Sequence, residues 1–136
     1  FHLCWGAYAG LYYHYGIKKF DLDKKLFGIF PHQILKKTSP LFRGFNDEFL
    51  APHSRATDVN VSDVAAVPEL EIMALTKEGS LAIAKTKDSR QLLLTIIVML
   101  KRLNWNTQEW TMNRQALISY SRFTRILYCD KIIRNV

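Results

Sequence analysis

The chain has little cysteine and none of the patterns that mark export. Its two cysteines, Cys4 and Cys129, do not make a disulfide framework, so a reducing cytoplasmic location is expected. No segment has the charged start, apolar middle and small-residue cleavage site of a signal peptide. The longest apolar run, residues 92–100, is too short to span a bilayer, so no membrane partner is expected.

Glycine and proline are missing from the C-terminal part of the chain. Neither occurs after Gly79, so residues 80–136 lack the usual turn residues. Residues 1–88 hold 11 Lys+Arg and 10 Asp+Glu, whereas residues 89–136 hold 8 and 2. A basic tail is one indication of nucleic-acid binding. The chain begins with Phe1 and not Met, which we interpret as a fragment or the product of a broken reading frame.

The pattern that is present alternates strands and helices, which predicts an α/β fold. Expected strands are residues 1–4, 26–30 (stopped by Pro31), 70–75, 81–85 and a last one starting at 92–94, with a hairpin turn at 77–80. A helix is expected over residues 6–16, ended by Gly16. We expect a charged connector over 18–25, a loop over 32–50 and a polar turn over 51–55.

Cys4 lies where the first strand should turn into the first helix. A thiol at such a turn is exposed for nucleophilic attack, and Gly6 and Ala7 leave room for the bend. The helix N-terminus favours a thiolate, and its free backbone N–H groups can bind an oxyanion. The alternative is a buried thiol in the core, which is the common fate of a lone cysteine.

Six stretches, in this order, resemble the homoserine O-acyltransferase family, which includes homoserine O-succinyltransferase and its acetyl-transferring relatives. They are residues 4–7 (CWGA), 11–17 (LYYHYGI), 24–28 (KKLFG), 43–49 (RGFNDEF), 51–55 (APHSR) and 68–72 (PELEI). The resemblance implies part of a flavodoxin-like sheet with helices, like that of the class I glutamine amidotransferases. Residues 1–95 would be the C-terminal part of the family domain, and residues 96–136 a basic tail, irregular or helical, without a family match.

The resemblance implies acyl transfer from succinyl-CoA or acetyl-CoA to the hydroxyl of L-homoserine, in methionine biosynthesis, through a cysteine acyl-enzyme. Cys4 matches the nucleophile, and Trp5 would supply a backbone N–H to the oxyanion while its indole packs. Lys25 and Ser54 match substrate-binding positions, and a lysine suits the carboxylate of homoserine. Otherwise Lys25 is an exposed charge and Ser54 caps a turn. Acyl-CoA is a co-substrate, no bound cofactor or metal is implied, and the intact family could form homodimers.

The family's catalytic base is a His supported by a Glu, in a Thr-Gly-His-x-Glu-Tyr-Asp stretch. After Thr95, this chain has Ile96 in place of the Gly, Ile97 in place of the His and Met99 in place of the Glu. Neither Ile nor Met accepts a proton, so impaired turnover is expected. The match stops abruptly, which we interpret as a frameshift. The positive charge of the tail then carries no information on nucleic-acid binding, and no nucleic-acid partner is expected.

With the family's base histidine absent, His14, His32 and His53 are the candidates for a base. Of these, His14 and His53 are expected to be structural. Two alternatives to the acyltransferase remain. One is an amidotransferase-like or peptidase-like cysteine hydrolase on the same fold. The other is a non-catalytic basic interaction module that acts through residues 96–136.

Overall fold

The computed structural model describes residues 1–96 of the chain, and the tail predicted over 96–136 lies almost wholly outside them. Six strands form one mixed sheet in the order β1-β6-β5-β4-β2-β3. The strands are β1 (His2–Leu3), β2 (Lys19–Ile34), β3 (Glu48–Val59), β4 (Leu70–Thr76), β5 (Leu81–Thr86) and β6 (Leu92–Leu94). The β1–β6 pair is parallel and the other pairs are antiparallel. The predicted α/β class is confirmed.

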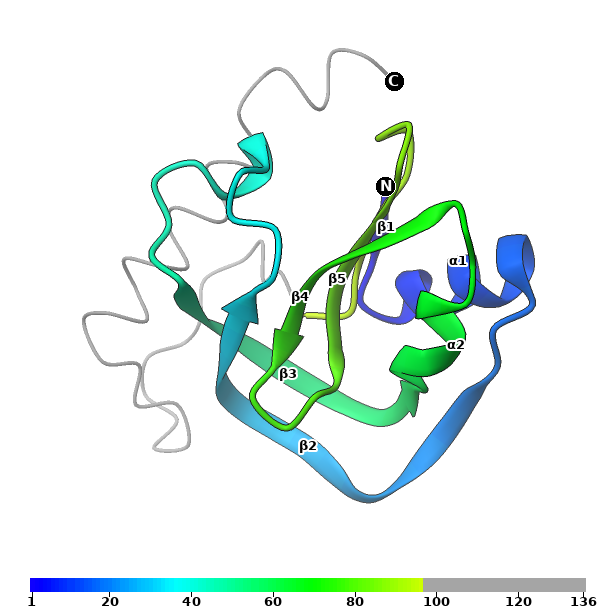
Figure 1. Ribbon diagram of the computed structural model, residues 1–136. Helices are drawn as coiled ribbons and strands as arrows, with labels where there is room; N and C mark the ends of the chain where they lie inside the picture. Colours follow the sequence, from blue (N-terminus) through cyan, green and yellow to red (C-terminus); the bar gives the residue numbers. More distant parts are fainter. Residues whose placement is uncertain (97–136) are drawn as a thin grey trace.

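Two α-helices, α1 (Trp5–Tyr15) and α2 (Val61–Ala65), lie beside one another against the sheet (Figure 1). They bury one face of it, where Leu11 of α1 and Val64 of α2 pack with Leu93 of β6. Gly16 ends α1 in the left-handed conformation (φ 69°), which glycine adopts without steric cost, as predicted. Within the described residues, no helix is long and apolar enough to cross a membrane.

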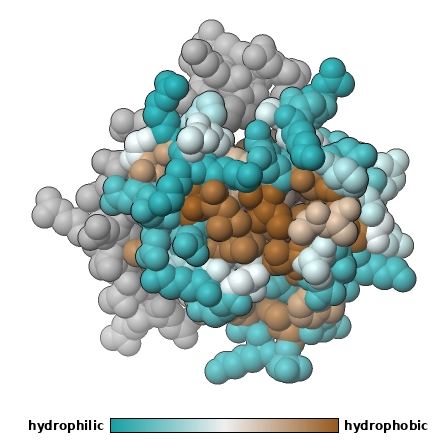
Figure 2. Space-filling view, in the orientation of Figure 1, coloured by the Kyte–Doolittle hydropathy of each residue, from teal (hydrophilic) through white to brown (hydrophobic). Residues whose placement is uncertain are grey.

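The opposite face of the sheet is covered by the segment that joins β2 to β3. This segment contains a short 3-10 helix, η1 (Pro40–Phe42), and its Phe42 packs with Phe49, Ile83 and Leu94. Leu93 and Leu94 are fully buried on opposite faces of the short strand β6. Seen in space-filling form, one side of the molecule also has an apolar patch ringed by hydrophilic residues (Figure 2).

The hairpin predicted from β4 to β5 is confirmed, and so is the strand at residues 92–94. The connector predicted over residues 18–25 is wrong, because β2 begins at Lys19 and forms a long ribbon with β3. The stop predicted at Pro31 is also wrong. β2 pairs with β4 only across His32–Ile34, so Pro31 lies at the end of that pairing, where its carbonyl oxygen accepts from the Lys77 N–H at 3.3 Å and a missing N–H is tolerated.

The polar turn predicted over residues 51–55 is wrong as well. These residues form the middle of β3, and Pro52 pairs with Ile29 on an edge strand of the sheet. The loop predicted over 32–50 is shorter than expected, because β2 continues to Ile34 and β3 begins at Glu48. Pairing between the two strands, which are distant in sequence, therefore outweighs the local turn preference of proline and serine.

Candidate active site

The strand-to-helix turn predicted at Cys4 is present. Cys4 is the residue before α1, with φ 53° and ψ −120°, a conformation that costs a non-glycine residue about 1–3 kcal/mol. The turn is anchored on both sides. The Cys4 N–H donates to the Leu94 carbonyl oxygen at 2.7 Å, and the Ala7 N–H donates to the Cys4 carbonyl oxygen at 3.0 Å. The thiol side chain is half-buried, so it is not enclosed in the core.

Trp5 is the first residue of α1. The first backbone N–H groups of a helix have no acceptor within the helix, and they lie at its positive end. The Trp5 N–H is therefore suited to stabilise negative charge that develops beside Cys4. The prediction that the Trp5 indole packs is wrong for the part of the chain described, because the residue is 69% exposed.

Lys25 and Ser54 both neighbour Phe27 in the β2–β3 ribbon. Lys25 is exposed and lies within the stretch between Asp21 and Leu26 where the strand register shifts, and its Nζ lies 5.4 Å from the centre of the Phe27 ring. Phe27 in turn pairs with Ser54, which is half-buried in the middle of β3. The alternative that Ser54 caps a turn is therefore wrong. No hydrogen bond or ion pair within residues 1–96 joins Lys25 or Ser54 to Cys4 or Trp5.

A buried charged cluster links the helix that follows Cys4 to the strand that carries Ser54. Arg55 is 6% exposed, and its Nη1 donates to Asp58 Oδ1 at 2.6 Å and to the Tyr8 hydroxyl of α1. Burial raises the pKa of Tyr8, and the nearby Arg55 cation opposes that rise. Sequence reasoning missed this cluster because it placed Arg55 in a turn. The only signal was the opposite charges of Arg55 and Asp58 three residues apart.

His32 and His53 form a second buried pair between β2 and β3. Both are fully buried, their Nε2 atoms are 2.7 Å apart, and their rings stack with centres 4.9 Å apart. Burial lowers the pKa of His32 to about 4, and burial followed by the neighbouring His32 lowers the pKa of His53. Both imidazoles are therefore neutral at pH 7. His14 is exposed on α1, edge to face with His2, and no described hydrogen bond joins a histidine to Cys4.

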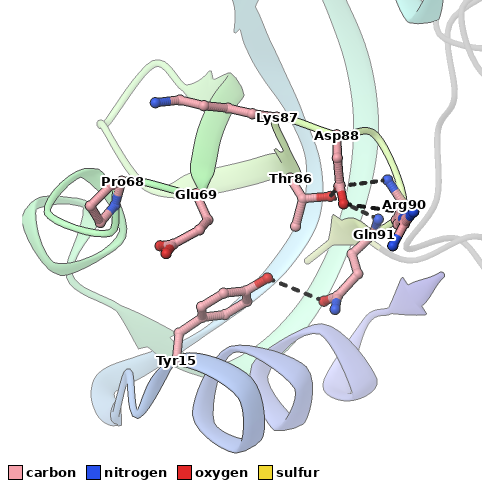
Figure 3. Close-up of a pocket in the computed structure, with 8 residues that line it drawn as sticks. All are labelled: Tyr15, Pro68, Glu69, Thr86, Lys87, Asp88, Arg90 and Gln91. Carbon is pink, nitrogen blue, oxygen red and sulfur yellow. Dashed lines mark hydrogen bonds and ion pairs between the residues drawn. The ribbon is translucent and has the colours of Figure 1, made fainter.

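Among residues 1–96, two hollows adjoin α1. The first, which we call the α1 hollow, has about 540 Å³ and starts beside the nucleophile turn; it is lined by Trp5, Tyr8, Ala9, Tyr12, Tyr13, Lys18 and Lys19. The second, the Gln91 hollow, has about 510 Å³ and lies at the other end of the helix (Figure 3); it is lined by Tyr15, Pro68, Glu69, Thr86, Lys87, Asp88, Arg90 and Gln91.

Most of the residues that line the Gln91 hollow are polar or charged, and several of their side chains bond to one another. The Tyr15 hydroxyl donates to Gln91 Oε1 at 3.4 Å, and Thr86 Oγ1 donates to Asp88 Oδ1 at 2.5 Å (Figure 3). Asp88 also accepts from the Arg90 backbone N–H at 3.0 Å. Within residues 1–96, no three His, Cys, Asp or Glu side chains gather closely enough to hold a metal ion.

Comparison of the sequence with known proteins shows the family of the chain. Residues 1–98 match the family model described as HTS, homoserine O-succinyltransferase. The chain is 49% identical over 94 residues to a homoserine O-acetyltransferase of Bacillus subtilis, covering 69% of this chain and 31% of that protein. It is 52% identical over 95 residues to a homoserine O-acetyltransferase of Acetivibrio thermocellus, covering 70% and 31%. The chain therefore spans about a third of the length of these curated relatives.

Solved structures share the fold at much lower identity. A protein proposed to belong to a GMP synthase, from Thermoplasma acidophilum, matches with a TM-score of 0.60 and 11% identity, covering 98% of this chain and 59% of that one. The protein SMU.1228c matches with a TM-score of 0.63 and 17% identity, covering 97% and 62%. These matches confirm the predicted amidotransferase-like fold and carry no information on the reaction.

Proposed function

Because this chain belongs to the homoserine O-succinyltransferase family, we propose that it carries the acyl-accepting part of a homoserine O-acyltransferase site, with Cys4 as the nucleophile. The observation that carries the proposal is the conformation of Cys4. A half-buried thiol stands at a strained turn, directly before the N-terminus of α1. Strained backbone of this kind persists where the surrounding structure holds it, and it is concentrated at functional sites.

In the first step, the Cys4 sulfur attacks the carbonyl carbon of the acyl-CoA thioester. A new bond forms between Cys4 Sγ and the acyl carbon, the bond from that carbon to the coenzyme A sulfur breaks, the thiol proton of Cys4 passes to that sulfur, and coenzyme A leaves as a free thiol. The negative charge on the carbonyl oxygen in the transition state faces the start of α1. The Trp5 backbone N–H is the donor that we assign to it.

In the second step, the homoserine hydroxyl oxygen attacks the acyl carbon, Cys4 leaves as a thiolate, and the hydroxyl proton passes to a base. We propose that Lys25 binds the homoserine carboxylate and that Ser54 offers a hydroxyl on the same ribbon. Their support is the register that pairs Phe27 with Ser54 and the contact between Lys25 and Phe27.

The second step is where this chain should be slow. The sequence has Ile97 and Met99 where the family has its base and supporting carboxylate, and both lie outside the described residues. Loss of a general base slows a reaction by roughly 10²–10⁴-fold. We therefore propose that the chain takes an acyl group on Cys4 and passes it on poorly.

We also propose that residues 1–95 are the family part of the chain and that residues 96–136 are a separate tail; the family model matches residues 1–98 and so ends close to this boundary. The cysteine hydrolase alternative shares the fold, but the acyltransferase family match favours acyl transfer. The basic-module alternative concerns residues that lie outside the described ones. Cytoplasmic location and a homodimer stay predictions.

Intact-protein mass spectrometry tests the proposal. The purified chain is incubated with acetyl-CoA or succinyl-CoA, and the expected result is one added acyl group, located on Cys4 by peptide mapping, with little product after homoserine is added. The Cys4→Ala variant should take up no acyl group, whereas Cys129→Ala should behave like the parent chain. Equal labelling of Cys4→Ala, or fast turnover of homoserine by the parent, would contradict the proposal.

A further inference from the structure

The α1 hollow lies along a face of the helix that the reaction steps above leave without a role. Its aromatic residues recur at the spacing of one helix face, with Trp5 followed by Tyr8 and then by Tyr12 and Tyr13. Three of these rings face solvent, because Trp5 is 69%, Tyr12 61% and Tyr13 83% exposed. Large aromatic groups are usually buried, so a hollow lined with exposed rings marks a surface that a ligand or another protein segment covers.

The charge of the α1 hollow is positive. Lys18 and Lys19 line it, and no carboxylate does. None of the ion pairs within residues 1–96 involves either lysine. Two lysines that make no ion pair with the described residues, beside exposed aromatic rings, suit a ligand that has both a planar ring system and phosphates.

We infer that the α1 hollow binds the nucleotide end of the acyl-CoA donor, an inference that rests on the proposed function. The adenine would stack on the tyrosine rings, and the phosphates would lie against Lys18 and Lys19. The hollow starts at Trp5, next to the nucleophile, and Tyr13 lies about 12 Å further along the helix, from a rise of 1.5 Å per residue. That separation leaves room for the flexible arm that joins the thioester to the nucleotide.

A hydrophobic segment of protein is the other kind of occupant that exposed aromatic rings could take. The charges of the hollow argue against it, because an apolar segment would cover Lys18 and Lys19 without pairing them. The nucleotide has groups that match both features of the hollow. Binding of free coenzyme A should therefore weaken as salt is raised, since contacts between lysine and phosphate are screened.

Titration calorimetry of the full chain with coenzyme A is the first test. The double variant Tyr12→Ala, Tyr13→Ala should weaken binding roughly 10-fold or more, because stacking of one base on an aromatic ring is worth about 5- to 150-fold by alanine substitution. The double variant Lys18→Gln, Lys19→Gln should weaken binding and flatten its salt dependence. Two double variants serve as matched controls. Phe1→Ala with Phe20→Ala removes two exposed rings outside the hollow, and Lys24→Gln with Lys87→Gln removes two exposed charges outside it.

The second test separates this inference from the proposed function. Each variant is acylated with acetyl-CoA and with a short acetyl thioester that lacks the nucleotide, and the rate of Cys4 labelling is measured. The hollow variants should slow labelling by acetyl-CoA and leave labelling by the short thioester unchanged. The inference is overturned if the hollow variants change the labelling rate with neither donor, or if the parent chain does not bind coenzyme A. No labelling of Cys4 by either donor would overturn the proposed function.

Discussion

At the scale of single residues, the fold depends on two buried polar pairs that span β2, β3 and α1. Arg55 is charged and almost fully enclosed, with Asp58 as its ion-pair partner. His32 and His53 are uncharged at pH 7 and are hydrogen-bonded to each other through their Nε2 atoms. A buried polar group is tolerated when it is partnered and is costly when the partner is removed. These residues should therefore be among the most sensitive to substitution.

Removing Asp58 should destabilise the chain strongly. The Asp58→Ala variant leaves the Arg55 guanidinium buried beside Tyr8 without its carboxylate, which costs about 3–5 kcal/mol in comparable cases. The matched control is Asp47→Ala, because Asp47 pairs with Lys37 at 2.8 Å on the exposed surface and such pairs contribute about 0–1 kcal/mol. Urea unfolding of both variants measures the difference in the free energy of unfolding. Similar decreases for the two variants would contradict the prediction that the buried pair contributes more than the exposed one.

The histidine pair should make stability depend on pH in the acidic range. The folded-state pKa of both rings lies below 6.5, so the unfolded chain takes up protons that the folded chain does not as the pH falls below 6.5. The free energy of unfolding should therefore decrease from about pH 6.5 down to about pH 4, by up to about 1.4 kcal/mol per pH unit for each ring.

Urea unfolding at several pH values between 7 and 4 checks this dependence. The double variant His32→Gln, His53→Gln should show a flatter profile than the parent, although its stability at pH 7 is lower. The control His14→Gln, which removes an exposed ring, should keep the parent profile. An unchanged slope in the double variant would mean that other groups produce the pH dependence.

At the scale of elements, α1 sets the position of the nucleophile turn through its contact with β1. A Cβ atom added at Gly10 would lie 2.8 Å from His2 Nδ1 and 2.9 Å from His2 Cγ, whereas one added at Gly6 would meet nothing within 4 Å. Glycine at Gly10 thus lets the helix approach the strand that leads into Cys4. Gly6 and Gly10 therefore have different roles, although the sequence shows both as glycines of one helix.

Alanine at the two positions should act in opposite directions. Gly6→Ala should stabilise the chain by about 0.5–1 kcal/mol, because alanine loses less backbone freedom in a helix. Gly10→Ala should destabilise it by about 1–3 kcal/mol, because the new methyl group displaces the His2 ring. Thermal unfolding of both variants measures the difference, and a stabilised Gly10→Ala would show that His2 moves aside freely.

At the scale of the whole molecule, the two ends of the described chain meet in the sheet. β6 pairs with β1 in parallel and with β5 in antiparallel fashion, and its Leu93 and Leu94 are fully buried on opposite faces. The edge of the sheet at β1 is therefore formed by pairs of residues more than ninety positions apart, His2 with Leu93 and Leu3 with Leu94. The hydrogen bond from the Cys4 N–H to the Leu94 carbonyl oxygen makes the nucleophile turn depend on the same strand pairing.

Truncation tests where the folded part of the chain ends. A chain of residues 1–96 should keep the far-UV circular dichroism and cooperative unfolding of the described fold. A chain of residues 1–91 lacks β6 and should lose both, because burial of each leucine side chain contributes about 1.5–3 kcal/mol against a small total stability. If residues 1–96 fail to fold while the full chain folds, the division into a family part and a separate tail is wrong.

The sequence by itself determined the features that depend on neighbouring residues. Gly16 marks the end of α1, the Lys77–Ser80 turn marks the β4–β5 hairpin, and Cys4 marks the turn before the first helix. The ordered stretches also identified the family, and so the reaction that is proposed. These signals are local, or they lie in the identity and order of the residues, so no long-range contact is needed to see them.

Only the tertiary structure decided how β2 and β3 pair and which side chains meet across them. His32 and His53 are 21 residues apart in sequence, and Arg55 and Tyr8 are 47 apart. Such contacts depend on the strand register, which is fixed by burial of whole strand faces and not by local preferences. The α1 hollow likewise combines exposed helix positions with two lysines beyond the helix, a combination that appears only when the chain is folded.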